Sequence, residues 1–449
     1  MTPATSLPAS SPAVPLATAA RFWLQLGLVS FGGPAGQIAL LHTELVERRR
    51  WLSERRFLHA LNYCMLLPGP EATQLATYLG WLMHGLGGAL IAGGLFLLPS
   101  VLVLLGLSAI YALWGQLPVL VAVFWALKPA VLGIVLQAAW RLGRRTLHNP
   151  ALLLIAAAAC LALAVGRVPY PALIIATALV GWIGGRLRPA LFQAPSRHVA
   201  SATADATADA TPCIALHGDD TPTPAHARFH WRRLALTLLG GGVALGLPLT
   251  LLSLAGGWNG QLATMARFFT KVALVSFGGA YAVLPYVAQG AVETYGWLEA
   301  GQMVDGLALG ETTPGPLIMV VAFVGFMGGW NASGTLSAGV VAGLVVVWFT
   351  FLPSFLFILA GGPLVEASRE DLRVGAPLTS ITAAVVGVIL SLALYLAGPA
   401  LAPAGRLDGG AVLMLLAAVV LLGRGLGALP VIGAATVVGL GRWWLTAGG

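Results

Sequence analysis

Apolar stretches cover almost the whole chain, and glycine or proline interrupts many of them. The longer stretches are predicted to be membrane-spanning helices, near residues 86–113, 118–140, 150–166, 170–188, 234–255, 334–361, 376–398, 411–425 and 428–446. Shorter arms come in pairs that meet at a glycine or proline, at 21–48, 57–83, 264–293 and 301–328. Each arm has about 13–15 residues and is roughly 20 Å long, which is short for a bilayer. The pattern predicts an all-α polytopic membrane protein with broken or re-entrant helices.

The breaks recur at a fixed distance along the chain. Ser30-Phe31-Gly32-Gly33 returns 246 residues later as Ser276-Phe277-Gly278-Gly279, and Pro68-Gly69-Pro70 returns at the same offset as Pro314-Gly315-Pro316. After a slip of eight residues, Leu98-Pro99-Ser100 matches Leu352-Pro353-Ser354. Helix breakers shared by the two parts of a chain are typical of transporters with internal repeats.

Arginine placement indicates that the two repeats have opposite orientations. The first-repeat loops 48–56 and 141–148 are rich in arginine, whereas their second-repeat counterparts, 294–302 and 395–401, contain no basic residue. The loop at 114–118 is uncharged, whereas its counterpart at 363–373 contains two arginines. Because basic loops stay in the cytoplasm, the sequence predicts inverted repeats, and the unpaired span at 234–255 supplies the inversion.

The predicted organisation therefore has five parts. They are a disordered amino-terminal tail at 1–20, a first transporter repeat at 21–188, a polar linker at 189–232, an extra transmembrane helix at 233–256 and a second, inverted repeat at 257–449. The tail lacks the basic segment of a cleaved signal peptide. The linker is rich in Ser, Ala, Thr, Asp and Pro, a composition typical of disordered segments.

The same arginine assignment constrains the short arms. With 48–56 and 141–148 in the cytoplasm, the 57–83 pair must enter and leave on one side, as a re-entrant hairpin with Pro68-Gly69-Pro70 at its tip. The 21–48 and 264–293 pairs are each either a second hairpin or one broken span, and the arginines favour neither. Such backbone is tolerated in a bilayer only where protein buries it or a wet cavity receives it. Four tips are therefore expected to converge near the midplane.

Composition narrows the class of function. The chain is 58% hydrophobic and 9% charged, so its net charge of +8 reflects loop arginines and suits an anionic substrate rather than a nucleic acid. Cys64, Cys160 and Cys213 lie far apart, and the sequence has neither a CxxC nor a HExxH motif. We therefore expect no metal, no cofactor and no disulfide framework, and an enzyme acting inside the membrane is disfavoured.

Four cationic residues are candidate ligands for an anion. Lys128 and Lys271 are the only lysines, and both lie in apolar sequence. An ammonium inside a span costs about 2.5–3.5 kcal/mol on insertion scales, so Lys128 is predicted either to face the substrate or to pair with a carboxylate. Arg21 and Arg267 share one repeat position, with Lys271 one turn after Arg267. These three residues are either substrate ligands or anchors at the headgroups.

The glycine and proline breaks are the stronger signal for a binding site. A broken helix exposes unpaired backbone amides, and the amino terminus of the helix that follows the break carries partial positive charge. Both features suit an oxyanion. The candidate substrate-binding residues at the breaks are Gly32, Gly33, Gln37, Pro68, Gly69, Gly278, Gly279 and Gly315. The alternative is that the breaks are kinks or packing notches, which their repetition makes less favourable.

Three carboxylates lie in apolar sequence, at Glu71, Asp305 and Glu311. Burial disfavours the charged form of a carboxylate, so Glu71 and Glu311 are candidate proton carriers. Each is equally well interpreted as a helix cap or as the partner of Lys128.

These residues resemble the chromate ion transporter family, in its long two-domain form. The first-half resemblance rests on Ser30 to Pro34, Gly36, Gln37, His42, Glu44, Trp51, Phe57, Pro68 to Pro70, Gly80 and Phe96 to Pro99. The second-half resemblance rests on Phe277 to Gly279, Trp297 and Thr313 to Pro316. It covers about residues 18–400. The short forms of the family are single domains of opposite orientation that work as pairs, which agrees with the inversion inferred from the arginines.

The resemblance implies a function that the residues alone do not give. It implies a multi-pass protein of the bacterial inner membrane that exports chromate, a tetrahedral sulfate-like dianion, using the proton-motive force. The expected partners are chromate or a sulfate-like oxyanion and the lipid bilayer, with no nucleic acid, and a homodimer stays open. The alternatives are a general oxyanion carrier of the sulfate type and a passive anion channel.

Overall fold

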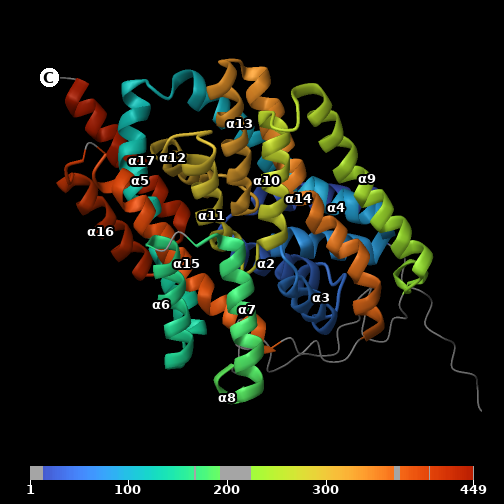
Figure 1. Ribbon diagram of the computed structural model, residues 1–449. Coiled ribbons are helices and arrows are strands. Elements are labelled where there is room, and N and C mark those ends of the chain that lie inside the picture. The colour runs from blue at the N-terminus through green and yellow to red at the C-terminus, as the bar shows by residue number, and fades with distance from the viewer. Residues whose placement is uncertain (1–13, 166–167, 193–223, 369–374, 404, 448–449) are drawn as a thin grey trace, which may run out of the picture.

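The computed structural model describes residues 14–165, 168–192, 224–368, 375–403 and 405–447, and within them the secondary structure is helical throughout (Figure 1). The first half comprises α1 (Leu16–Val29), α2 (Gly33–His42), the π-helix η1 (Thr43–Arg48), α3 (Glu54–Leu66), α4 (Glu71–Trp114), α5 (Pro118–Thr146), α6 (Pro150–Ala164), α7 (Tyr170–Leu187) and α8 (Pro189–Phe192). The short η2 (Ala225–Ala227) and the long α9 (Trp231–Gly256) follow.

The second half repeats this order of elements. It comprises α10 (Gln261–Val275), α11 (Ala280–Ala288), the π-helix η3 (Gln289–Thr294), α12 (Ala300–Thr312), η4 (Leu317–Met319), α13 (Val320–Ser333), α14 (Leu336–Ser368), α15 (Gly375–Leu401), α16 (Gly409–Gly423) and α17 (Ala428–Ala447). The two π-helices differ in position by the same 246 residues as the glycine breaks, so even an unusual helix form recurs.

Among the described residues, seven helices are long and apolar enough to cross a membrane, namely α4, α5, α7, α9, α14, α15 and α17. The shorter apolar helices include α1, α6 and α16. Together with the composition, these helices make the chain an all-α, multi-pass membrane protein, as the sequence predicts.

The 44-residue α4 is two helices that fold back on each other. The backbone leaves helical geometry at His84 and Gly85, where Gly85 has φ +64°. Gly80, before the break, packs so closely on Ala92, after it, that a Cβ at residue 80 would clash with the Ala92 side chain. The chain therefore reverses direction at Gly85. The reversal between α13 and α14 is equivalent, because Gly329 packs against the Ala338 carbonyl and Gly334 has φ +68°.

The 21–48 segment also folds as a hairpin, which answers a question that the arginines leave open. Arg49, just after η1, places its guanidinium 4.6 Å from the centre of the Phe22 ring near the start of α1. The Trp51 ring also lies 4.9 Å from Phe22. In the second half, Phe268 of α10 lies 5.6 Å from Trp297. Both segments thus return to the end from which they start.

Long helices of each half pack against the last two helices of the other half. α5 packs on α16 and α17, and α15 packs on α6 and α7 (Figure 1). Gly387 of α15 lies against the Ala156 carbonyl of α6, and Gly439 of α17 lies against the Ala122 carbonyl of α5. This exchange holds the halves together, and the repeat pattern in the sequence does not predict it.

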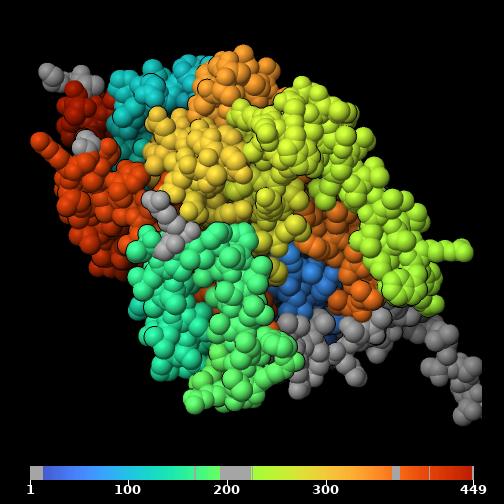
Figure 2. All heavy atoms as spheres, viewed as in Figure 1, coloured from blue at the N-terminus to red at the C-terminus, as the bar shows by residue number. Residues whose placement is uncertain are grey.

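The helix α9 lies on the outside of the molecule, as a ridge along one edge (Figure 2). Gly241 is its one buried residue, packed against Leu356 of α14. The other large apolar side chains of α9 are mostly exposed, which suits contact with lipid. It occupies the place of the extra helix expected at 233–256. The expected tail at 1–20 is helical from Leu16 onward, and residues 1–13 and 193–223 of the expected tail and linker lie outside the described residues.

Candidate functional site

Two pairs of hairpin tips meet at the centre of the molecule, and each pair joins the two halves. The Gly69 amide donates to the Ser276 carbonyl (2.7 Å), and the Gly315 amide donates to the Ser30 carbonyl (2.6 Å). Gly69 and Gly315 occupy equivalent positions, as do Ser30 and Ser276. The tip of each proline-glycine-proline hairpin is therefore bonded to the glycine break of the opposite half.

The glycines at these tips are required by the backbone. Gly32, Gly33, Gly278 and Gly279 have φ between +72° and +93°, a region that L-residues rarely adopt. Gly69 (φ +132°) and Gly315 (φ +99°) also lie beside a serine, since a Cβ would come within 2.3 Å of the Ser354 Oγ at residue 69. The equivalent distance at residue 315 is 2.4 Å, to the Ser100 Oγ. Positive φ thus favours glycine at all six positions, and close packing excludes a side chain at Gly69 and Gly315 as well.

The serines of the repeated Leu-Pro-Ser motif are part of the tips, a role that the sequence reasoning missed. The Ser100 hydroxyl donates to the Pro314 carbonyl (2.6 Å) across the two halves. In the first half, the Gln74 amide donates to the equivalent Pro68 carbonyl (2.7 Å) instead. The recurrence of Leu98-Pro99-Ser100 at Leu352-Pro353-Ser354 was the available signal for these contacts.

A small cavity lies between the tips. It is lined by Pro34, Gln37, Pro70, Glu71, Ala72, Gly279, Ala280, Pro316 and Leu317. Three α-helices, α2, α4 and α11, begin at its wall, and η4 leads from it into α13. The amino termini of helices concentrate unpaired backbone amides and partial positive charge. The volume is about 10 Å³, room for about one water molecule, so an oxyanion fits only if the tips move apart.

Glu71 is the one ionisable residue among the described residues that line this cavity. It is the first residue of α4, and its equivalent in the second half is Leu317. Glu311 lies close by on α12 and accepts a hydrogen bond from the Tyr281 hydroxyl of α11 (2.5 Å). Gln37 is buried and donates to the Ser30 carbonyl (3.4 Å). The structure thus brings Gln37, Glu71 and Gly279 together at this cavity, and the other tip glycines do not line it.

Lys128 lies away from the tip cavity and has a carboxylate partner. Its ammonium is 3.3 Å from Asp305 of α12, which also accepts a hydrogen bond from the Tyr111 hydroxyl (2.8 Å). Asp305 is only 5% exposed. The pairing was one of the two interpretations of Lys128 from the sequence. The cluster ties α4, α5 and α12 together across the two halves.

The other three candidate cationic ligands, Arg21, Arg267 and Lys271, lie toward the open ends of the hairpins. Arg21 of α1 is exposed. Arg267 of α10 donates to the Trp258 carbonyl (2.7 Å), and its guanidinium lies 4.3 Å from the centre of the Trp258 ring. Lys271 is one turn nearer the tips and, with Arg267, lines a larger cavity of about 720 Å³.

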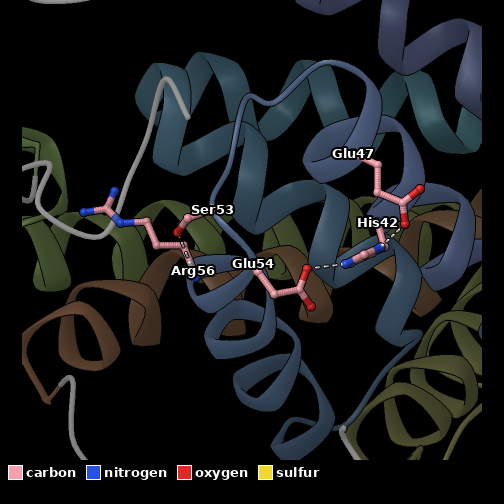
Figure 3. A network of polar contacts seen from close by, with 5 residues as sticks. All are labelled: His42, Glu47, Ser53, Glu54 and Arg56. Atoms are coloured by element: carbon pink, nitrogen blue, oxygen red, sulfur yellow. Dashed lines mark hydrogen bonds and ion pairs between the residues drawn. The ribbon is translucent and has the colours of Figure 1, made fainter. Parts of the chain in front are cut away.

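The open end of the first hairpin carries a different cluster, which the sequence did not predict (Figure 3). His42 lies between two carboxylates, with Nδ1 3.1 Å from Glu47 and Nε2 2.5 Å from Glu54. The cluster closes the end of α2 and η1 onto the start of α3.

The fold and these contacts define a multi-pass, all-α membrane protein whose broken helices meet at its centre. The chain belongs to the chromate transporter family, because the family model described as "Chromate transporter" matches residues 17–182 and 263–440. The two matched regions contain the two sets of tips.

Curated relatives agree with this assignment. The chain is 33% identical over 374 residues to the chromate transport protein of Pseudomonas aeruginosa, covering 82% of this chain and 78% of that protein. It is 29% identical over 389 residues to the chromate transport protein of Cupriavidus metallidurans, covering 86% and 84% respectively. A probable chromate transport protein of Synechococcus elongatus is 28% identical over 382 residues, with 84% of each chain covered. No solved structure gives a significant match to the chain.

Proposed function

We propose that this protein exports chromate, or a closely related tetrahedral oxyanion, from the bacterial cytoplasm across the inner membrane. Family membership supports a chromate transport role. The observation that carries the site is the tip cavity, where three α-helices from both halves begin around one carboxylate. The amino termini of helices bind oxyanions through backbone amides and need no buried counter-charge.

In this proposal, the Glu71 carboxylate and the anion compete for the same helix amino termini. An ionised carboxylate at the start of α4 is stabilised by the amides that an oxyanion would use. A proton on Glu71 removes that competing charge and admits the dianion. Glu311, which the Tyr281 hydroxyl holds near the tips, is the second candidate for carrying a proton.

The two halves are proposed to be inverted repeats that rock against each other to alternate access. The reciprocal bonds from Gly69 and Gly315 lie at the contact that such a motion would open. Lys128 keeps its proposed part in transport through Asp305, as a contact between halves that must persist or re-form as they move. Direct coordination of the anion is left to the tip residues, with Arg21, Arg267 and Lys271 contributing charge at the hairpin ends.

The electrical part of the proton-motive force favours export of a dianion. Moving one elementary charge through about 100 mV changes the free energy by about 2.3 kcal/mol. An inside-negative potential therefore drives two negative charges outward with twice that energy. In this scheme the Glu71 proton and the dianion bind together, so a proton that leaves with the dianion lowers the exported charge to one, which the electrical potential still drives outward.

Uptake of radiolabelled chromate into everted membrane vesicles tests the proposal, since eversion converts export into accumulation. We expect accumulation that an uncoupler abolishes, and vesicles without the protein provide the control. Equal accumulation of chromate and sulfate would indicate a general oxyanion carrier. Flux that only follows the anion's own gradient and ignores the uncoupler would indicate a channel and contradict the coupled exporter.

A further inference from the structure

The larger cavity lies at the open end of the second hairpin, between α10, the segment that follows η3 and the last turn of α13. Its lining residues are Asn259, Gln261, Thr264, Arg267, Phe268, Lys271, Tyr295, Gly296, Trp297, Gly328, Asn331 and Ala332. We call this cavity of about 720 Å³ the vestibule. None of its lining residues belongs to the tip cavity, so the two spaces are separate.

The vestibule carries two positive charges and no carboxylate among its described lining residues. The Arg267 guanidinium is held in place by the Trp258 carbonyl (2.7 Å) and the Thr264 hydroxyl (3.2 Å). Lys271 is exposed, and within the described part of the chain no ion pair or hydrogen bond engages its ammonium. One cation is therefore fixed and the other is free to meet a ligand.

The rest of the wall is neutral and held by its own contacts. Tyr295 stacks on Trp297, with ring centres 4.7 Å apart and an angle of 10° between the planes. The Gln261 amide donates to the Gly328 carbonyl (2.8 Å), and the Asn331 amide donates to the Trp297 carbonyl (3.0 Å). These contacts preform the wall, so Lys271 is the side chain that has to be ordered when an ion binds.

The helix α10 leads directly from the vestibule to the tips. Lys271 precedes Ser276 by five residues, which is about 8 Å along a helix, and Arg267 lies one turn further out. An anion leaving the tips would therefore meet Lys271 first and Arg267 next.

The first half does not provide an equivalent site. The residue equivalent to Lys271 is Gln25, and Tyr295 corresponds to Arg49. Arg49 is bonded to Glu44 (3.4 Å), and Glu47 and Glu54 bracket His42 at the same end. Of these two hairpin ends, only the second has a cavity whose described lining carries cations and no carboxylate.

We propose that the vestibule is a second anion site, which binds a tetrahedral dianion on the side opposite the arginine-rich loop 48–56. This inference rests on the proposed transport of an oxyanion and adds a station between the tips and the exterior. Two cations match the charge of chromate or sulfate, and the volume leaves room for a partly hydrated ion, so the ion is held by charge and released without full dehydration.

A cysteine reporter tests the site without depending on transport. Ala332→Cys, in a background with Cys64→Ala, Cys160→Ala and Cys213→Ala, places a thiol in the vestibule and leaves both cations intact. Its rates of modification by anionic and by cationic methanethiosulfonate reagents are compared in right-side-out and everted vesicles. Thr335→Cys, at the same end but outside the lining, is the matched control.

We expect the anionic reagent to be favoured at Ala332→Cys by at least about tenfold relative to Thr335→Cys, because a cationic cavity concentrates anions. The reagents should act on right-side-out vesicles. Sulfate, which does not oxidise thiols, should slow the reaction, whereas chloride at equal ionic strength should not. Adding Lys271→Gln should remove both the preference and the protection.

Equal rates for the two reagents, absence of protection by sulfate, or reaction only in everted vesicles would each overturn the vestibule site. Chromate accumulation by the same vesicles separates the two proposals. Accumulation without sulfate protection would remove the vestibule and leave the exporter, whereas protection without any accumulation would leave an anion site in a protein that does not export chromate.

Discussion

The open ends of the two hairpins have nearly the same backbone and very different side chains. Both end in a π-helix, and the equivalent residues Arg50 and Gly296 have φ +53° and +60°. In the first half, His42 bridges Glu47 and Glu54. In the second half the residues equivalent to His42 and Glu54 are Ala288 and Ala300, and a cationic cavity takes the place of the cluster. The two ends therefore share the backbone shape that leads to the tips and differ in their chemistry.

The tips are the part in which the halves are alike, and substitutions there should have the largest effect. Gly69→Ala and Gly315→Ala each force a Cβ against a serine hydroxyl and onto positive φ, with strain on the order of 1–3 kcal/mol. We expect both variants to lose chromate accumulation in everted vesicles. Gly94→Ala, which has open space around its Cβ position, is the control. Normal transport by either tip variant would break the equivalence of the halves.

The Lys128–Asp305 pair has no counterpart at the equivalent positions of the two halves, because these positions hold Thr382 and His59. Lys128→Ala leaves the buried Asp305 carboxylate without its cation, which typically destabilises a protein by about 3–5 kcal/mol. We expect a lower thermal unfolding midpoint in detergent and a loss of transport. The double variant Lys128→Ala/Asp305→Asn should recover much of the stability.

Transport by that double variant distinguishes two roles of Lys128. Recovered transport would mean that the pair acts as a contact between the halves. Recovered stability without transport would mean that the lysine itself meets the anion, as one interpretation of the sequence holds.

The sequence predicted the tips better than their surroundings. Helix breakers at a fixed offset located all six tip glycines, because only glycine tolerates the positive φ that these turns require. Side-chain partners such as Ser100 with Pro314, or Tyr281 with Glu311, join residues far apart in the chain, and periodicity carries no information about them. The exchange of α6 and α7 onto α15 was unpredictable for the same reason.

The histidine cluster should matter mainly for the end of the first hairpin. His42→Ala removes the ring that contacts both carboxylates and leaves Glu47 and Glu54 without their shared partner. We expect faster amide hydrogen exchange across residues 43–56. Exchange at 289–302 should not change, and a change there would show that the two ends are coupled.

The smallest effects should come from the caps of α6 and α16, which are alike in both halves. The Asn149 side chain accepts from the Leu152 amide (3.0 Å), and Asp408 accepts from the Gly410 amide (2.8 Å). Replacing either residue by alanine should cost about 1 kcal/mol of stability, measured as a lower unfolding midpoint.

Of these two caps, only Asp408 should make a contribution to the free energy of unfolding that depends on pH. The Trp125 indole, which donates to Asp408 (2.6 Å), lowers the pKa of that carboxyl in the folded protein. Its contribution is therefore present above the unfolded pKa and disappears as the pH falls through the lowered folded value. Asp408→Asn should cost less stability in acid than at neutral pH, while the Asn149→Ala cost should stay constant.

Glu71, which lines the tip cavity and corresponds to Leu317 in the second half, is central to the proposed transport mechanism. The most direct test is binding of radiolabelled sulfate to the purified protein at acidic and alkaline pH, for the wild type and Glu71→Gln. Competition between the carboxylate and the anion predicts that wild-type binding weakens as the pH rises, whereas Glu71→Gln binds equally well at both. Two results would contradict the proposal that an oxyanion and the Glu71 carboxylate compete for the helix amino termini at the tips. They are an unchanged pH dependence of sulfate binding in Glu71→Gln and a loss of sulfate binding by this variant at acidic pH.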